Sequence, residues 1–359
     1  MSLQTYLNPT DICAGQTAVM LNANAKRVTP KLVERVSQVV PHRDLFLSRS
    51  MEEARDQVQT VVARGYHRLL SGGGDGTLMN VVTLVDRLVR ESTSRGREVE
   101  APEIGVLRLG TGNAVASVLG AGRFNQDVAR HLREDQSYRV YLDMVRSVDN
   151  DTLCPFTGIG YDGEILNDYN WLKQHARGPL SRLLMQTSLG YLTSLFSRTV
   201  PRKVAELGRR KPVARVTSLG RAFYVDPKRG DELVPWEDEL LYEGPVSIIS
   251  AGSVPYYGFR FKMFPFAGRR PGFMQLRVAS VGALPPLMHL GKLWKGTFRH
   301  PQIQDFLVEE VRVEGERPLP YQLGGDAYGE RDSLHLRVSE NPVAMAALRP
   351  LPRALPAAA

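Results

Sequence analysis

The stretch YHRLLSGGGDGTLMNVV at residues 66–82 decides the fold of this chain. Its first five residues are typical of the end of a buried strand, and its last five open an apolar pattern with helical spacing. Three consecutive glycines, an Asp and a Thr lie between the two. A glycine-rich turn from a strand into a helix lets a phosphate approach backbone N–H groups at the positive end of the helix dipole. The stretch therefore predicts an anion site on a strand–loop–helix unit.

The loop holds an acidic residue, Asp75, where a purely anion-binding loop would hold none. A carboxylate beside phosphates repels them unless it binds a metal or takes a proton. The prediction places Asp75 near the reacting phosphate or its Mg²⁺, with phosphate contacts from the whole loop: Gly73, Gly74, Asp75, Gly76 and Thr77. The alternative is a turn whose glycines serve geometry alone, although a turn requires fewer of them.

Strands and helices alternate on both sides of the loop. Strands are predicted at 17–24, 44–47, 66–70 and 104–109, helices at 30–40, 51–64, 78–90 and from 114, and a charged loop at 91–100. This alternation predicts a mostly parallel sheet with helices on both faces, and ligands at the carboxyl ends of the strands.

A second glycine turn, Gly110-Thr111-Gly112-Asn113, follows one strand–helix unit later. Taken alone, this motif is as typical of a plain turn as of a binding loop. Its place beside the first loop in a doubly wound sheet makes Gly110, Thr111 and Asn113 candidate nucleotide contacts.

The pattern changes near residue 138, where short β runs separated by turn residues begin. They predict a β-rich sandwich or barrel, interrupted by a helical segment at about 164–199 and a charged loop at 226–243. The tail at 351–359 is rich in Ala and Pro and is expected to be disordered.

Composition limits the class of protein. The chain has 359 residues, a formal net charge of +8 and two cysteines, Cys13 and Cys154. These numbers favour anionic partners and give no disulfide framework. No apolar run approaches the ~20 residues of a membrane span, and the N-terminus has no secretory pattern. We expect a cytoplasmic protein, with peripheral attachment to a membrane left open.

Two further segments allow both a functional and a structural interpretation. The stretch GIGYDG at 158–163 matches GxGxxG, but no βαβ unit follows it, so it is not a dinucleotide fingerprint. Asp162 and Glu164 there are either contacts for a substrate's polar head or acids at a helix start. Residues 178–203 carry apolar residues at helical spacing with interleaved arginines such as Arg182. They form either a core-facing helix or a surface with arginines on lipid phosphates.

GGDGT at 73–77 followed by GTGN at 110–113 resembles the catalytic domain of the diacylglycerol kinase family, which includes bacterial lipid kinases and sphingosine and ceramide kinases. Asn22 and Ser48 are similar to that family's nucleotide-turn residues, and GIGYD at 158–162 is similar to the opening of its second domain. The segments 295–297 and 321–326 match more weakly.

The resemblance implies a doubly wound α/β nucleotide-binding domain over residues 1–140, related to NAD kinases, which residues of about 335–350 could complete. It implies a β-sandwich for the lipid substrate over 141–334. The reaction would move the γ-phosphate of ATP, with Mg²⁺, to a lipid hydroxyl in a cleft between the domains. The partner would be a lipid at an anionic membrane surface rather than a nucleic acid; a homodimer stays open.

The chain also departs from the family's pattern. The family's late Asp-Gly-Glu corresponds to Gly324-Gly325-Asp326, which leaves Asp326 as the candidate base, with Glu330 or Asp75 as alternatives. Pro271 replaces an Asp of the bacterial magnesium segment, so that second metal site is predicted to be absent. Ala114 replaces the Asp that usually follows Asn113.

Three functions remain open at this point. A lipid kinase could act on diacylglycerol, a sphingoid base or ceramide. A non-catalytic nucleotide- or lipid-binding homologue would explain the changes at Gly324 and Ala114. NAD kinase shares the GGDGT loop, but the motif that follows it in NAD kinases is missing here.

Overall fold

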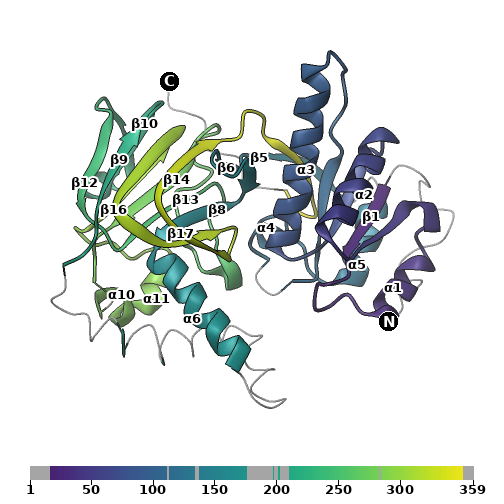
Figure 1. Ribbon diagram of the computed structural model, residues 1–359, viewed down its shortest axis with the longest axis horizontal. Helices are drawn as coiled ribbons and strands as arrows, with labels where there is room; N and C mark the ends of the chain where they lie inside the picture. Colours follow the sequence, from purple (N-terminus) through teal and green to yellow (C-terminus); the bar gives the residue numbers. More distant parts are fainter. Residues whose placement is uncertain are drawn as a thin grey trace. The chain divides into compact units, whose positions relative to one another are not determined.

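The computed structural model describes residues 17–110, 113–133, 137–175, 197, 201–202, 210–282 and 284–350. The chain divides into two compact units. Unit 1 comprises Met1–Leu142 and Asn341–Arg353, and unit 2 comprises Asp143–Glu340 and Ala354–Ala359. Figure 1 shows the elements of each unit, which we describe in turn.

Unit 1 is built on a six-stranded sheet in the order β2-β1-β3-β4-β18-β5. Its strands are β1 (Thr17–Asn22), β2 (Leu45–Ser48), β3 (Arg68–Gly73), β4 (Glu103–Arg108), β5 (Tyr138–Leu142) and β18 (Val343–Ala347). The neighbours from β2 to β18 are parallel, and β5 runs antiparallel to β18. The predicted parallel α/β domain is thereby confirmed, and a strand from the far end of the chain joins its sheet.

The helices of unit 1 are α1 (Pro30–Ser37), α2 (Met51–Ala63), α3 (Asp75–Ser94), α4 (Ala114–Val118) and α5 (Phe124–Leu132), with a 3₁₀ turn at His42–Asp44. Thr29 and Ser50 cap α1 and α2 through side-chain oxygens that accept backbone N–H groups. The helix α3 ends at Ser94, so the loop predicted from 91 begins later. Glu91 is exposed in the last turn of α3, and the other charged residues of the predicted loop follow the helix.

Unit 2 is antiparallel and β-rich, as predicted, and its twelve strands form one hydrogen-bonded sheet. They are β6 (Val145–Ser147), β7 (Thr152–Cys154), β8 (Phe156–Gly160), β9 (Val213–Ser218), β10 (Ala222–Asp226), β11 (Glu232–Trp236), β12 (Leu240–Pro245), β13 (Ile248–Gly252), β14 (Met274–Ala279), β15 (Ile303–Val308), β16 (Glu310–Leu323) and β17 (Asp326–Val338). The long strand β16 pairs with β9 near its start and with β8 near its end. One strand thus belongs to two parts of the sheet.

Within the described residues, the helices of unit 2 with assigned bounds are α6 (Tyr161–His175), α10 (Leu284–Met288) and α11 (Leu290–Trp294), with 3₁₀ turns at Pro227–Arg229 and Gly258–Arg260. None of the helices in the described part of the chain is long and apolar enough to cross a membrane.

The prediction of a charged loop at 226–243 is wrong, because this segment contains β11 and most of β12. β11 pairs with β10, and β12 pairs with β9, each at a margin of the sheet. Most of the charged residues of the segment lie in the turns, with Lys228, Arg229 and Asp231 before β11 and 237–239 between the two strands, whereas each strand holds a single Glu. Short strands between charged turns therefore resemble one long charged loop in the sequence.

Candidate active site

The residues predicted to meet the nucleotide gather at one edge of the sheet of unit 1. In the register of the parallel strands, Asn22 lies beside Ser48, and Gly73 lies beside Arg108. These four residues end β1, β2, β3 and β4. Carboxyl ends of parallel strands are where ligands bind in open α/β sheets.

The first loop closes tightly around the start of α3. Gly74 is the N-cap of this 20-residue helix and supplies no side-chain cap. A Cβ on Gly73 would overlap the side chain of Thr77. Thr77 Oγ1 in turn accepts a hydrogen bond from Asn22 Nδ2 at 2.9 Å. The first N–H groups of α3 therefore lie at the carboxyl end of the sheet, and the side chain of the N-cap residue does not cap them. Uncapped N–H groups at a helix start can bind an anion.

The two glycine loops touch through their backbones. A Cβ on Gly110 would overlap Gly74 Cα and lie 2.8 Å from Gly74 N. Asn113 stabilises the second loop: its φ is 54°, and its Nδ2 donates to Gly110 O at 2.6 Å. Asn113 is almost fully buried. The structure thus places Asn113 in the frame of the loop, and Thr111 lies outside the described residues.

Asp75 joins the two loops. Its carboxylate accepts hydrogen bonds from the backbone N–H of Ala114 at 2.8 Å and of Val115 at 3.4 Å, at the start of α4. A carboxylate at a helix N-terminus is favoured by the helix dipole. The acid that the sequence assigns to phosphate or metal therefore also holds the second loop against the first.

Gly110→Ala is expected to weaken ATP binding at least about tenfold, because a main-chain clash with Gly74 cannot be relieved by turning a side chain. Calorimetric titration with ATP measures the effect. Gly122→Ala in the same unit is the matched control, since a Cβ there meets only Asp127 Oδ1 at 3.8 Å. Equal affinities of the two variants would contradict the close approach of the loops.

Unit 2 buries a second acid, Asp162, in the first turn of α6. Its Oδ2 accepts hydrogen bonds from Ser250 Oγ and the Tyr257 hydroxyl, and Gln322 Nε2 donates to that hydroxyl at 3.3 Å. Ser250, Gly158 and Gln322 stand in one row across β13, β8 and β16. A Cβ on Gly158 would collide with Ser250 and Asp162, so glycine is required there. We name Asp162, Ser250, Tyr257 and Gln322 the Asp162 cluster.

Burial raises the pKa of the Asp162 carboxyl from 3.8 to about 6, and the hydrogen bonds from Ser250 and Tyr257 act in the opposite direction. Asp162 is only 7% exposed. The folded protein therefore holds this proton more tightly than the unfolded chain does. The stabilisation that follows is complete below pH ~4 and is lost as the pH rises through about 6.

Asp162→Asn removes this titration while keeping an acceptor for the two hydroxyls. The unfolding free energy of the variant, relative to wild type, should therefore increase by about 2–3 kcal/mol between pH 4 and pH 7. Urea unfolding followed by tryptophan fluorescence reports on unit 2, because Trp171, Trp236 and Trp294 all lie there. A difference that does not change with pH would show that Asp162 does not titrate in this range.

Glu164 forms an ion pair outside the Asp162 cluster. Arg202 Nη2 lies 3.2 Å from Glu164 Oε2 and 2.9 Å from Asp168 Oδ2. Glu164 is thus neutralised by an arginine, while Asp162 is surrounded by hydroxyls. Arg182, the third predicted substrate contact, lies outside the described residues, as does most of the amphipathic segment at 178–203.

Asp326 is exposed and begins β17 directly after a two-residue turn. Both turn residues have positive φ, 60° at Gly324 and 90° at Gly325, as a tight hairpin turn demands. Gly325 N donates to Gln322 Oε1 at 3.0 Å. The side chain of Gln322 therefore ties the turn that carries Asp326 to the Asp162 cluster.

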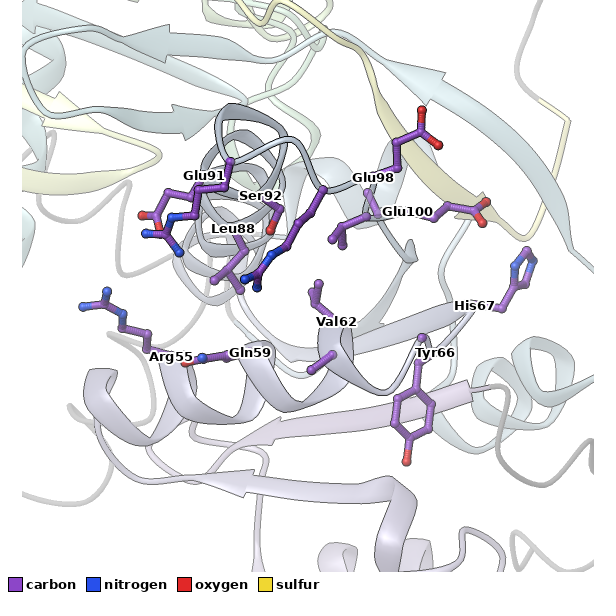
Figure 2. A pocket seen from close by; sticks show the side chains of 16 residues that line it. Arg55, Gln59, Val62, Tyr66, His67, Leu88, Glu91, Ser92, Glu98 and Glu100 are labelled. Carbon is purple, nitrogen blue, oxygen red and sulfur yellow. The ribbon is translucent and has the colours of Figure 1, made fainter.

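A pocket of about 620 Å³ lies elsewhere in unit 1 (Figure 2). Arg55 and Gln59 come from α2, Leu88 and Glu91 come from α3, and His67 precedes β3. This is the amino end of β3, opposite the glycine loops. The pocket contains none of the predicted site residues, and its lining mixes both signs of charge.

No group of three or more His, Cys, Asp or Glu side chains is arranged to hold a metal within the described ranges. No pattern in the sequence indicates Ser250, Tyr257, Gln322 or the amide of Ala114 as partners of the two acids. These residues are distant along the chain, and only the sheet pairing brings them together.

The fold and the paired loops define an α/β domain of the type that binds nucleotide phosphates. Residues 17–145 match the sequence model of the diacylglycerol kinase catalytic domain. The resemblance drawn from the two loops is thereby confirmed. No curated protein sequence matches the chain.

Solved structures agree on the fold. A diacylglycerol kinase of Bacillus anthracis strain Sterne is 14% identical, with a TM-score of 0.58, and the match covers 92% of this chain and 96% of that one. A candidate diacylglycerol kinase of the same strain is 13% identical, with a TM-score of 0.60 and coverage of 90% and 94%. At these identities the likeness shows the fold alone.

Proposed function

We propose that this protein is a lipid kinase that transfers the γ-phosphate of ATP to a lipid hydroxyl. The observation that carries the proposal is the backbone contact between the two glycine loops, at the uncapped start of α3. The match of residues 17–145 to the diacylglycerol kinase catalytic domain supports a lipid rather than another acceptor.

The residues at the loops suit a triphosphate. Backbone N–H groups at the start of α3 would bind phosphate oxygens, and the glycines leave room for close approach. Asn22 holds Thr77, and Asp75 holds the start of α4. Ser48, Thr111 and Asn113 complete the proposed nucleotide contacts or their supports. Mg²⁺ would offset charge on the phosphate oxygens, with Asp75 as its protein contact.

The transfer forms a bond between the lipid hydroxyl oxygen and the γ-phosphorus and breaks the bond from that phosphorus to the β–γ bridging oxygen. ADP leaves with the bridging oxygen, and the hydroxyl proton passes to a carboxylate. Asp326 is the proposed base because it is exposed on a turn that Gln322 orders.

The Asp162 cluster is proposed to bind the polar head of the lipid. A carboxylate with hydroxyl neighbours can exchange hydrogen bonds with a glycerol or sphingoid hydroxyl, and its charge would favour an amine. Glu164 and Arg182 are kept as lesser candidates, since Glu164 is engaged by Arg202.

The test is ATP-dependent phosphorylation of diacylglycerol, sphingosine and ceramide in detergent micelles, with the product identified by mass spectrometry. A phosphorylated lipid that requires both ATP and Mg²⁺ is expected from one member of the panel. If the protein binds ATP but phosphorylates none, the non-catalytic homologue becomes the better function. Phosphorylation of NAD instead would establish the NAD kinase alternative.

We further propose a cytoplasmic protein that meets its substrate at an anionic membrane surface, alone or as a homodimer.

A further inference from the structure

One segment accounts for the net positive charge of the chain. Residues 244–304 contain eight Lys and Arg residues and no Asp or Glu. The remaining 38 Lys and Arg residues equal the 38 Asp and Glu residues of the chain, so the rest of the molecule is neutral. A region without acids, 61 residues long, accounts for the whole net charge of +8.

The same segment contains two short helices of unit 2, α10 and α11, which Figure 1 labels. Neither helix has a buried residue. Met288 is 74% exposed and Leu284 is 41% exposed. Leu287, Leu290, Leu293 and Trp294 are partly exposed on the same two helices. We name residues 284–294 the α10–α11 hairpin. Single exposed apolar residues are ordinary, but a contiguous set marks an interaction surface.

Basic residues lie on and next to the α10–α11 hairpin. Lys292 and Lys295 are exposed on it or directly after it. Arg260 and Lys262 lie on the turn that packs against its end, since Lys262 N donates to Trp294 O at 3.0 Å and Phe261 contacts the Trp294 ring. In the described part of the chain, none of these four cations forms an ion pair.

The other basic residues of the segment contact acids or aromatic rings. Arg299 donates to Gly296 O at 3.0 Å and pairs with Asp231, and Arg269 lies over the Phe266 ring at 4.6 Å. Arg270 lies over the Phe223 ring at 4.2 Å, and Arg277 is buried in an ion pair with Asp305. The four basic residues on or next to the α10–α11 hairpin have neither kind of partner among the described residues.

We propose that the α10–α11 hairpin docks unit 2 onto an anionic lipid bilayer. The side chains of Leu284, Met288 and Trp294 would enter the boundary between headgroups and acyl chains, where tryptophan is favoured. Lys292, Lys295, Arg260 and Lys262 would meet lipid phosphates at the same depth. An anionic bilayer has a negatively charged surface over an apolar interior. The exposed apolar side chains match its interior, and the cations match its charge.

Sedimentation with vesicles, in the absence of nucleotide and substrate, tests this surface. The full chain should bind phosphatidylcholine vesicles that contain phosphatidylglycerol, and bind far less to phosphatidylcholine alone. Lys292→Gln with Lys295→Gln should weaken the partition coefficient by on the order of 20-fold. Met288→Glu should weaken it about tenfold or more.

Matched controls come from the same unit. Leu240→Glu changes an exposed apolar residue outside the segment, and Lys228→Gln with Arg317→Gln removes two exposed charges there. These variants should bind as wild type does. Vesicles with brominated lipids should quench the tryptophan fluorescence of the wild-type protein. The quenching should be clearly smaller for the Trp294→Phe variant.

Failure to bind anionic vesicles, or losses of equal size in the control variants, would overturn the proposal. So would a Met288→Glu variant that binds vesicles normally but loses self-association, because the surface would then join two copies of the chain. Activity in detergent micelles does not need this surface, so a failed docking test leaves the kinase proposal standing, and a failed kinase test leaves the docking proposal standing.

Discussion

Asp75→Ala is expected to lower kcat/KM for lipid phosphorylation by about 10³-fold or more. The substitution removes the acceptor for the N–H groups of Ala114 and Val115 and so releases the second glycine loop from the first. It also removes the carboxylate that we propose as the protein contact of Mg²⁺. Both losses act on the position and charge of the phosphoryl group being transferred.

Asp75→Asn separates these two contributions. An amide oxygen can still accept from Ala114 N, but it carries no charge. We expect its activity to lie between those of wild type and Asp75→Ala, with circular dichroism unchanged in all three. Wild-type activity in Asp75→Asn would limit the role of Asp75 to positioning, and wild-type activity in Asp75→Ala would exclude it from the site.

Asp326→Asn is expected to reduce turnover by about 10²- to 10⁴-fold, which is the usual contribution of a general base. ATP affinity should stay within about twofold of wild type, because Asp326 belongs to unit 2 and the nucleotide loops belong to unit 1. The fold should tolerate the change, since Asp326 is exposed and the hairpin turn is made by Gly324 and Gly325. Steady-state kinetics with varied ATP and varied lipid measure both parameters.

Glu330→Gln is the matched control for this prediction. Glu330 lies on the same strand, is also exposed, and was the alternative base from the sequence. It should retain wild-type turnover. If Glu330→Gln loses activity while Asp326→Asn keeps it, the base is Glu330. If neither loses activity, the proton goes to Asp75 or to solvent.

The sequence predicted much of unit 1 correctly because its signals are local. The strand ending in Gly73 and the helix from Asp75 appear in the structure within a few residues of the expected bounds. Apolar periodicity and capping residues such as Thr29 and Ser50 act over one or two turns, so they can be recognised in a single chain. The marginal strands β11 and β12 were missed because they are short and the turns before and between them are rich in charged residues.

Partners of the site acids could not be predicted in the same way. Asp162 receives hydrogen bonds from Ser250 and Tyr257, 88 and 95 residues away. The pairing of β8 with β13 and β16 places those residues together, and pairing registers are set by packing over the whole sheet. The same limit applies to Asp75, whose contact with Ala114 spans 39 residues.

The sequence by itself determined that this protein has a glycine loop with an acid at a strand–helix junction, a second loop one unit later, and a surplus of positive charge. Those features depend on residue type and spacing alone. Only the tertiary structure decided that Gly74 and Gly110 touch, that Asp75 bridges the loops, and that burial raises the pKa of Asp162. It also decided that four of the basic residues lie on or next to two helices with exposed apolar side chains. Contact, burial and exposure are properties of packed elements, and a chain acquires them only when distant segments come together.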